Sequence, residues 1–414
     1  MNDDQRDQAV AAQYETLPYP SRDPRDETRR LIIGSPSHLA EIEHYLFAGR
    51  IPRDQPFRAL VAGGGTGDAT IMLAQQAADA GLSAEITYLD QSSASRAVAE
   101  ARAAARALRN VRFVSGSLLA LDSLGLGPFD YIDCCGVLHH LEDPAAGLAA
   151  LTAALAPHGG MGLMLYGTIG RSGIYELQEM LRDIAGDGSP PARIALTRKL
   201  LAELPATNCF KLNPALRKER DDAELFDLLL HARDRAYTVP EIGALLDCCA
   251  LRLVSFIDPA SYDPAFYLKD ALLLRRAAAL APIAQAAIAE RLAGNLPRHV
   301  FYVTRRAHDV SPITLEQAGL DGVPVLRDLD GPQLADQLGK DRRITGTKDG
   351  LERTITLPPL GAALLRLIDG QRSLREIHAM LDNRRLDEAG FLAAFAALYR
   401  PLHGINWLLL RRAG

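Results

Sequence analysis

Residues 57–73 read FRALVAGGGTGDATIML and join an apolar run, a cluster of glycines and a helical stretch without interruption. The apolar run has the length and composition of a short buried strand, and the alanine-rich sequence from Asp68 to about Ala80 is typical of a helix. Glycine permits positive φ angles and lets a ligand approach the backbone closely. The following helix directs unpaired N–H groups and its positive dipole end at the same place. The segment therefore predicts a strand, a ligand-binding turn and a helix.

The same alternation continues downstream of the glycine turn. Four further apolar runs have the spacing of strands, and helical stretches such as 92–108 separate them. The runs are ITYLD (86–90), VRFVSG (111–116), YIDCCG (131–136) and MGLMLYG (161–167). Strands that alternate with helices in this way form a parallel sheet with right-handed crossovers. We predict an α/β fold with a Rossmann-like, doubly wound and mostly parallel sheet, which HVFYVTRR (299–306) would complete.

The chain of 414 residues is too long for one hydrophobic core, and its character changes along its length. Residues 1–50 are expected to form a helical strap or lid, because two prolines in LPYP break the helical pattern with a rigid elbow. Residues 51–309 are expected to form the sheet domain, with a helical insertion at about 170–295. Residues 310–414 show a strand-helix-helix-helix-strand order that suits a small α+β, winged-helix-like domain.

Composition and charge argue against several classes of protein. The net charge of -5 gives no attraction to nucleic acid, and Arg372, Arg375 and Arg384–Arg385 are interspersed with acidic residues. No apolar run reaches membrane-spanning length, and the polar start MNDDQRDQAV lacks the pattern of a signal peptide. Cys134–Cys135 and Cys248–Cys249 are adjacent pairs without the spacing of a metal site. We expect a cytoplasmic protein without bound metal, nucleic acid or membrane, and a homodimer stays open.

Asp90 ends the second predicted strand and is expected at the same sheet edge as the glycine turn. A carboxylate at this place accepts hydrogen bonds from both hydroxyls of a bound ribose. The alternative is that Asp90 caps the helix that begins near Gln91–Ser93. A dehydrogenase that binds a nicotinamide dinucleotide would show the same glycines and the same acid, so these two features leave the cofactor open.

Residues 129–144, FDYIDCCGVLHHLEDP, distinguish between the two kinds of cofactor. The run GVLHHLEDP resembles the VLHHL-DP run after the fourth strand of class I S-adenosylmethionine-dependent methyltransferases. ALAPHGGMGLMLY (154–166) is similar to the L-PGG turn and fifth strand of the same family. The resemblance covers residues 57–167, with four motifs in the family's order. It implies that the chain binds S-adenosylmethionine rather than a nicotinamide.

The resemblance also implies where the cofactor lies. The glycines would line its methionine and ribose, the loop after the third strand would border its adenine, and the end of the fourth strand would lie near its sulfonium. The residues so assigned are Gly63, Gly64, Gly65, Gly67, Asp90, Gln91, Gly116, Ser117, Leu118, Cys135 and Gly136. Ala62 stands where most relatives have an acidic residue, so we expect Asp68 to supply a substitute carboxylate for the cofactor's ammonium group.

Tyr14 and Tyr19 belong to the segment QYETLPYP (13–20). An aromatic face over a sulfonium gains cation–π attraction, so we assign both tyrosines to the cofactor site. The segment also resembles the Y-x-x-x-P-Y-P start of bacterial protein lysine methyltransferases. The alternative is that the two tyrosines only pack the strap against the rest of the protein.

Three side chains near the fourth and fifth strands are candidates for catalysis. Methyl transfer is an in-line displacement that needs alignment and, for some acceptors, a base. His139 and His140 are the candidate bases, because neutral imidazoles are available at pH 7. Tyr166 would orient the acceptor. The alternative for each of them is a structural role in packing or capping.

The methyl acceptor is less well defined by the sequence. The YETLPYP start favours a protein or peptide side chain, as does the C-terminal domain, which resembles the tail domain of the bacterial protein lysine methyltransferases. HARDRAYTVPEI (231–242) is similar to runs in other bacterial methyltransferases, and Arg233 and Arg235 would bind an acidic acceptor or form a solvated turn. A small-molecule methyltransferase and a protein that binds S-adenosylmethionine without catalysis are the alternatives.

Overall fold

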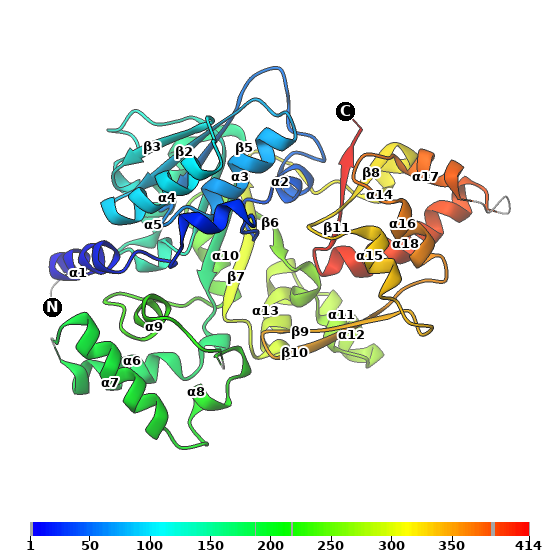
Figure 1. The fold of residues 1–414 in the computed structure, drawn as a ribbon. Helices are drawn as coiled ribbons and strands as arrows, with labels where there is room; N and C mark the ends of the chain where they lie inside the picture. The colour runs from blue at the N-terminus through cyan, green and yellow to red at the C-terminus, as the bar shows by residue number, and fades with distance from the viewer. Residues whose placement is uncertain (1–2, 187, 217, 382–385, 414) are drawn as a thin grey trace.

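The computed structural model describes residues 3–186, 188–216, 218–381 and 386–413. Its centre is a seven-stranded sheet in the order β3-β2-β1-β4-β5-β7-β6 (Figure 1). The strands are β1 (Phe57–Ala62), β2 (Ala84–Asp90), β3 (Val111–Ser115), β4 (Phe129–Cys135), β5 (Leu155–Tyr166), β6 (Leu251–Ile257) and β7 (Arg298–Arg305). Neighbouring strands are parallel except at β7, which pairs antiparallel with β5 and β6. The predicted Rossmann-like, mostly parallel α/β fold is confirmed.

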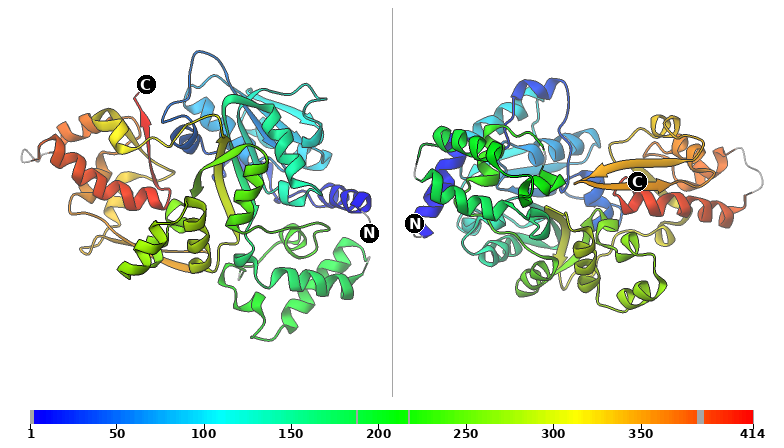
Figure 2. Two further views of the ribbon diagram at one scale, coloured as in Figure 1. Left: turned by 180° about the vertical axis from the view of Figure 1, so that it is seen from behind. Right: turned by 90° about the horizontal axis from the view of Figure 1, so that it is seen from below.

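Helices cover both faces of this sheet, as a doubly wound fold requires (Figures 1 and 2). The helices on one face are α5 (Pro144–Ala154), α10 (Val239–Cys248) and α13 (Pro282–Ala293). The helices on the other are α2 (Leu39–Leu46), α3 (Asp68–Asp79) and α4 (Ser93–Ala105). The alternation of β1 serves both layers, because Leu60 packs in the first core and Val61 in the second.

Strand β5 is longer than the sequence predicts. The expected turn at 154–160 is part of the strand, whose pairing with β4 shifts register between Phe129 and Tyr131. Gly160 explains the close packing here, because a Cβ at this residue would lie 2.5 Å from Leu46 Cδ2 on α2. Gly160 therefore lets α2 pack directly on the sheet, whereas a Cβ at Gly159 would meet the backbone of Phe129 and Asp130.

The helical insertion has a small core of its own. Its helices are α6 (Ile174–Ala185), α7 (Pro190–Glu203), α8 (Cys209–Leu212) and α9 (Asp222–Leu229), and α11 (Pro264–Tyr267) and α12 (Ala271–Ala278) follow β6. Asp221 caps α9, since its carboxylate accepts a hydrogen bond from the amide of Glu224. Leu177 and Phe226 belong to the buried cluster of this region, and Leu17 from the N-terminal segment packs against it.

The N-terminal segment crosses from the insertion to the sheet domain. Helix α1 (Asp3–Thr16) ends two residues before Pro18, as the sequence predicts, and a short 3-10 helix, η1 (Pro24–Thr28), follows. We call residues 17–28 the elbow segment. Glu15 fastens α1 to the start of α4, because its Oε2 accepts hydrogen bonds from Ser92 Oγ over 2.8 Å and from the amide of Ala94 over 3.0 Å.

The C-terminal region contains helices and two small antiparallel sheets. Its elements are α14 (Leu315–Ala318), β8 (Gly322–Leu326), α15 (Gly331–Asp336), β9 (Arg343–Lys348), β10 (Leu351–Thr356), α16 (Gly361–Leu367), α17 (Leu374–Met380), α18 (Glu388–Gly404) and β11 (Leu408–Arg412). The two strands that the sequence predicts are β10 and β11, but they pair with β9 and β8 rather than with each other. The winged-helix likeness stays a prediction, and Arg384–Arg385 lie outside the described residues.

This region shares a buried interface with the sheet domain. Leu409 of β11 belongs to the same core as α2, and Tyr45 Oη donates to Asn406 Oδ1 over 2.8 Å. Glu41, which is fully buried, accepts hydrogen bonds from Arg327, from Asn406 and from Tyr302 on β7. The predicted domain boundary at residues 309–310 therefore stays a proposal, since the sheet domain and the C-terminal region share a buried core across it. Among the described helices, none is long and apolar enough to cross a membrane.

Candidate functional site

The glycine turn connects β1 to α3 at the carboxyl edge of the sheet. The amides of Gly63 and Gly64 donate to the carbonyl of Leu89 on β2, over 2.8 and 3.1 Å. Gly63 has a φ of 73°, and a Cβ there would lie 2.3 Å from Val137 Cγ2, just after β4. The turn therefore requires glycine because the segments after β2 and β4 close around it.

Asp90 ends β2 and directs its carboxylate at this turn. Its Oδ2 accepts a hydrogen bond from the amide of Gly65 and its Oδ1 accepts one from the amide of Ser92, both over 2.8 Å. Burial raises the pKa of Asp90, while the hydrogen bonds from these amides and from Gln91 act in the opposite direction. Ser92 rather than Asp90 is the N-cap of α4. The structure brings Asp90 and the glycines together, and its role in ribose binding stays a prediction.

The residues assigned to the adenine lie beside Asp90. Gly116 donates its amide to the carbonyl of Asp90 over 3.0 Å, and Ser117 caps the short helix η2 (Leu118–Ala120). The Leu118 side chain is buried in the main core, so only the backbone of Leu118 borders the carboxyl edge of the sheet. Leu119, which the sequence analysis did not single out, is 54% exposed next to it.

The end of β4 completes the edge on the other side of the turn. Cys135 is half-buried, and its burial raises the pKa of the thiol, so the thiol stays protonated at neutral pH. Gly136 has a φ of 80° and donates its amide to the carbonyl of Met164 on β5. Gly136 and Cys135 lie one and two residues before Val137, whose side chain faces Gly63, so the chain brings them close to the glycine turn.

The elbow segment lies against the glycine turn. The carbonyl of Tyr19 accepts a hydrogen bond from the amide of Thr66 over 3.3 Å, and the carbonyl of Pro20 accepts one from Thr66 Oγ1 over 2.7 Å. A Cβ at Gly65 would lie 2.7 Å from the Tyr19 oxygen. Tyr19 is therefore at the glycine turn through its backbone, and the role of its ring at the cofactor stays a prediction.

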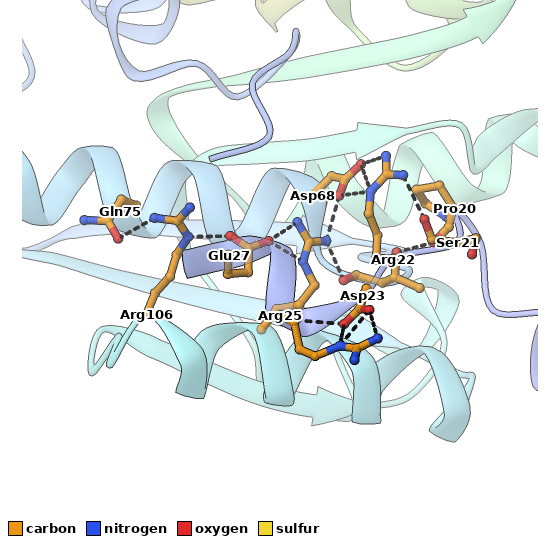
Figure 3. Close-up of polar contacts among 11 residues, drawn as sticks. Pro20, Ser21, Arg22, Asp23, Arg25, Glu27, Asp68, Gln75 and Arg106 are labelled. Carbon is orange, nitrogen blue, oxygen red and sulfur yellow. Dashed lines mark hydrogen bonds and ion pairs between the residues drawn. The ribbon is translucent and has the colours of Figure 1, made fainter. Parts of the chain in front are cut away.

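Asp68 fastens the elbow segment through a chain of ion pairs, which Figure 3 shows. Its Oδ2 lies 2.6 Å from Arg22 Nη2 and its Oδ1 lies 2.7 Å from Arg102 Nη1. Arg102 is 1% exposed and also pairs with Glu27 of η1, which in turn pairs with Arg106. Asp68 is thus at the turn as predicted, but its charge already has two partners within the protein. These partners compete with the ammonium group that we expected it to bind.

Tyr14 and Tyr166, which come from α1 and from the end of β5, meet at one carboxylate. Tyr14 Oη donates to Asp227 Oδ1 and Tyr166 Oη donates to Asp227 Oδ2, each over 3.1 Å. Tyr14 Oη also lies 3.2 Å from His231 Nε2. Burial and then the charge of Asp227 raise the pKa of Tyr14, Tyr19 and Tyr166, so all three phenols stay protonated at neutral pH.

The two candidate bases have different surroundings. His139 is fully buried, its ring stacks on Tyr166 with centroids 3.9 Å apart, and neither of its ring nitrogens has a hydrogen bond within the described chain. Burial lowers its pKa well below the usual value. His140 stacks on His231 at 3.8 Å, and its Nδ1 lies 2.8 Å from the carbonyl of Arg233. The packing of His139 fits the structural alternative, whereas His140 belongs to the polar cluster around Asp227.

Sequence reasoning missed Asp227 and His231. His231 opens the quoted HARDRAYTVPEI run, but the interpretation of that run rested on its arginines. Asp227 is a single acid in the apolar stretch of α9 and is 4% exposed beside Phe226 and Leu229. An acidic residue on the buried face of an amphipathic helix is the signal that could have identified it.

His140, Asp227 and His231 also have the composition of a metal site, and their ligand atoms lie within 4.8 Å of one another. The hydrogen bonds argue against it. His231 Nδ1 accepts a hydrogen bond from the amide of Arg233 over 3.1 Å, so the ring proton sits on Nε2, the nitrogen that faces the cluster. A protonated nitrogen is no metal ligand. Asp227 and His231 are instead joined through the Tyr14 hydroxyl, and His140 stacks on His231; we call these four residues the network.

Arg235 of the 231–242 run contacts residues outside this network. Arg235 is an exposed side chain that lies over Tyr237 and contacts Glu241 at 3.3 Å. Asp234, between the two arginines, forms a buried ion pair of 2.6 Å with Arg171, whose guanidinium lies over the Tyr166 ring. Arg235 therefore fits the solvated-turn alternative, while Asp234 holds the arginine that packs on the Tyr166 ring.

A cavity of about 470 Å³ opens between the elbow segment and α9. Its lining residues are Thr16, Leu17, Pro18, Ser21, Arg198, Asp221, Asp222 and Ala223. It adjoins the segment that carries Tyr19, and its lining includes none of the residues that the sequence analysis assigned to the cofactor or to catalysis.

Comparison with known proteins agrees with this geometry. Residues 60–161, which include the glycine turn, Asp90 and the β4 segment, match the family model of a methyltransferase domain. A protein of Synechococcus named as uncharacterized (syc1184_c) is 34% identical over 269 residues, which cover 62% of this chain and 61% of that protein. The chain thus spans about three fifths of the length of this relative.

Solved structures share the fold over most of the chain. PKMT2 from Rickettsia typhi in complex with AdoHcy superposes with a TM-score of 0.64 at 15% identity, over 91% of this chain and 75% of that one. A second structure of the same protein gives a TM-score of 0.66 at 14% identity. At this identity the likeness shows a common fold, and its coverage extends beyond the sheet domain.

Proposed function

We propose that this chain, whose residues 60–161 form a methyltransferase domain on a Rossmann-like class I fold, is an S-adenosylmethionine-dependent methyltransferase. The observation that carries the proposal is the edge where Gly63, Gly65 and Asp90 meet the end of β4, inside the matched residues. S-adenosylmethionine supplies a methyl group on a positively charged sulfur, which needs no further activation. The protein has to hold this group, align the acceptor and exclude water.

Each part of the edge suits one part of the cofactor. The Asp90 carboxylate, with its remaining acceptor capacity, would bind the ribose hydroxyls, and Gln91 with the 116–118 loop would border the adenine. Cys135 and Gly136 would face the sulfonium, with Tyr14 and Tyr19 supplying aromatic faces from the N-terminal segment. Asp68 is already paired with Arg22 and Arg102. We therefore propose the backbone carbonyls of the turn as alternative partners for the ammonium group.

Calorimetry with S-adenosylmethionine, AdoHcy and NAD tests this proposal on the full chain. We expect the first two to bind and NAD to give no signal. Binding of NAD alone would contradict the proposal, because it would assign the glycine turn and Asp90 to a dinucleotide.

A protein or peptide side chain is the acceptor that we propose. The support is the fold shared with PKMT2 over 91% of the chain, including much of the C-terminal region, and the YETLPYP start. Incubation with methyl-labelled cofactor and a cell lysate, followed by separation by size, tests it. Label in macromolecules supports the proposal, and label only in small molecules assigns a metabolite. Cofactor binding without transferred label would indicate a non-catalytic binding protein.

A further inference from the structure

Asp227 connects three segments that are far apart in the sequence. It comes from α9 in the helical insertion, Tyr14 from α1, and Tyr166 from the end of β5 in the sheet. Each carboxylate oxygen accepts one phenol O–H, so the two tyrosines are held at a separation that the carboxylate sets. Hydrogen bonds to a charged oxygen contribute about 1.5–3 kcal/mol each, more than neutral ones.

Tyr14 is fixed from two sides. Its hydroxyl donates to Asp227, and its oxygen accepts from His231, because the Nδ1 of His231 is occupied by the amide of Arg233 and the ring proton is therefore on Nε2. The carbonyl of the same Arg233 accepts from His140 Nδ1 over 2.8 Å. The backbone of one residue thus orients both stacked imidazoles, and this leaves little freedom for the Tyr14 hydroxyl.

Burial raises the pKa of Asp227, while the nearby His140 and the hydrogen bonds from the two tyrosines act in the opposite direction. In the part of the chain that the structure describes, Asp227 has no ion pair, and the nearby Arg171 is engaged by Asp234 at 2.6 Å. An unpaired buried carboxylate is costly unless hydrogen bonds satisfy it. The two tyrosine hydroxyls therefore stabilise the ionised form of the Asp227 carboxylate. Removal of either hydroxyl changes the carboxylate on which the other one depends.

The residues on either side of Tyr14 hold α1 in the position from which it reaches Asp227. Glu15, the residue after Tyr14, binds the start of α4, and the elbow segment that follows binds the glycine turn. Withdrawal of α1 would remove Tyr14 from the carboxylate and leave Tyr166 as the only phenol on it.

We propose that Asp227 is the positioning residue of the acceptor site and that, through Tyr14, it makes the docking of α1 a condition for methyl transfer. This inference rests on the proposed methyltransferase function and adds to it a residue and a segment. Asp227 acts through the two tyrosines that it binds, of which Tyr166 would orient the acceptor. The hydrogen bonds of Asp90 do not involve Asp227, and AdoHcy lacks the positive charge that the Tyr14 ring would face, so binding of AdoHcy and alignment of the acceptor are separable.

The central variant is Asp227→Asn, which keeps the size of the side chain but offers one acceptor oxygen in place of two. AdoHcy affinity is expected to stay within about twofold of the wild type, while the rate of label transfer to the lysate acceptor falls by about tenfold or more. Amide hydrogen exchange in residues 3–16 is expected to rise by about tenfold, because α1 loses its tie to α9. Asp183→Asn, an exposed carboxylate on α6, is the matched control and changes none of these quantities.

Coupling between variants separates positioning from a merely structural role. Tyr14→Phe is expected to reproduce the loosening of α1, and adding it to Asp227→Asn should have no further effect, since both remove the same bond. Additive effects would show that Asp227 acts only through the packing of α9 and would overturn the proposal. Unchanged label transfer in folded Asp227→Asn would also overturn it.

Two further results keep the outcomes distinct. If Asp227→Asn does not fold, Tyr14→Phe and Tyr166→Phe leave the carboxylate in place, and full label transfer in both would overturn the proposal. If the wild type binds neither S-adenosylmethionine nor AdoHcy, the methyltransferase function itself fails. Binding of both cofactors with normal transfer in all variants removes only the positioning role.

Discussion

Asp90 illustrates how one side chain can organise a binding edge before any ligand arrives. Its two oxygens already hold the amides of Gly65 and Ser92, one on each side of the β2 end. The carboxylate is therefore oriented by the backbone and would need little rearrangement to accept the ribose hydroxyls that we propose for it. Pre-orientation of this kind lowers the entropy lost on binding.

Replacement of Asp90 by alanine should weaken binding of S-adenosylmethionine by about 1–3 kcal/mol, the usual effect of losing charge-assisted hydrogen bonds. Calorimetry at constant salt measures it. Asp79→Ala, at the exposed end of α3, is the control, because that carboxylate only accepts from Gln75. Equal affinities for wild type and Asp90→Ala would remove Asp90 from the cofactor site.

Asp133 predicts a dependence of stability on pH. It is 2% exposed on β4, accepts a hydrogen bond from Ser37 Oγ over 2.7 Å, and has its pKa raised by burial to about 7. An unfolded aspartate has a pKa near 4, so between these values the folded protein holds a proton that the unfolded chain has lost. This contribution to stability is complete below about pH 4 and falls as the pH rises to about 7, by on the order of 4 kcal/mol.

Urea unfolding at several pH values between 4 and 8 measures this effect, with Asp133→Asn as the comparison. The amide does not titrate, so the free energy of unfolding of wild type relative to the variant should decrease across the window and then level off. A constant difference between the two proteins would show that Asp133 is ionised throughout.

At the scale of elements, the sequence predicts those strands and turns whose residues show a clear local pattern. The five strands from β1 to β5 are apolar because they are buried between two helical layers, and they were identified from that property. The glycine turn was identifiable because its conformation demands glycine. Strand β9, in contrast, is RITGTK with mostly exposed side chains, and it was missed because its stability comes from pairing with β10.

The polar side chains of the site were less predictable, because their partners are distant in the sequence. Tyr14 and Asp227 are 213 residues apart, and Arg22 and Asp68 are 46 apart. Neither partner carries a local signal of the other, so the sequence placed Tyr14 and Tyr19 near the cofactor but could not supply Asp227. It also assigned Asp68 to the ligand, because the two arginines that engage it were not apparent.

The elbow segment yields a prediction about the release of the cofactor. Arg22→Ala removes one of the two arginines on Asp68 and should weaken the attachment of residues 17–28 by about 1 kcal/mol, since the pair is partly exposed. We expect faster hydrogen exchange in this segment and a higher dissociation rate of AdoHcy. Arg25→Ala is the matched control, because the highly exposed Arg25 pairs only with Asp23 of the same segment. Identical dissociation rates in both variants would show that the segment does not retain the cofactor.

At the scale of the whole molecule, Glu41 joins the sheet domain to the C-terminal region. Its buried carboxylate accepts from Arg327, Asn406 and Tyr302, which belong to three separate parts of the chain. A deletion of residues 310–414 would leave this charge and the apolar side of α2 uncovered. Such a deletion therefore tests stability as much as acceptor recognition, and a point substitution is the cleaner probe.

Glu41→Gln should lower the free energy of unfolding by about 3 kcal/mol, because it leaves Arg327 without its buried partner. Glu85→Gln on the exposed side of β2 serves as control and should be neutral. Urea unfolding followed by fluorescence of the single Trp407, which lies next to β11, reports on the C-terminal region directly. A loss below about 0.5 kcal/mol is the usual effect of a surface substitution. Such a result would mean that the hydrogen bonds of Glu41 contribute little to the attachment of the C-terminal region.

The contact between α2 and β11 also has a consequence for how the protein is made. His44 and Leu410 meet although they are 366 residues apart, so the ribosome must add that length of chain after His44 before their contact can form. At about 5–20 residues per second, the side of α2 that receives β11 stays uncovered for roughly 20 to 70 s. Throughout this interval Ile42, Tyr45 and Leu46 are partly available to chaperones. We expect the nascent chain to depend on such helpers until β11 has emerged, whereas the finished protein does not.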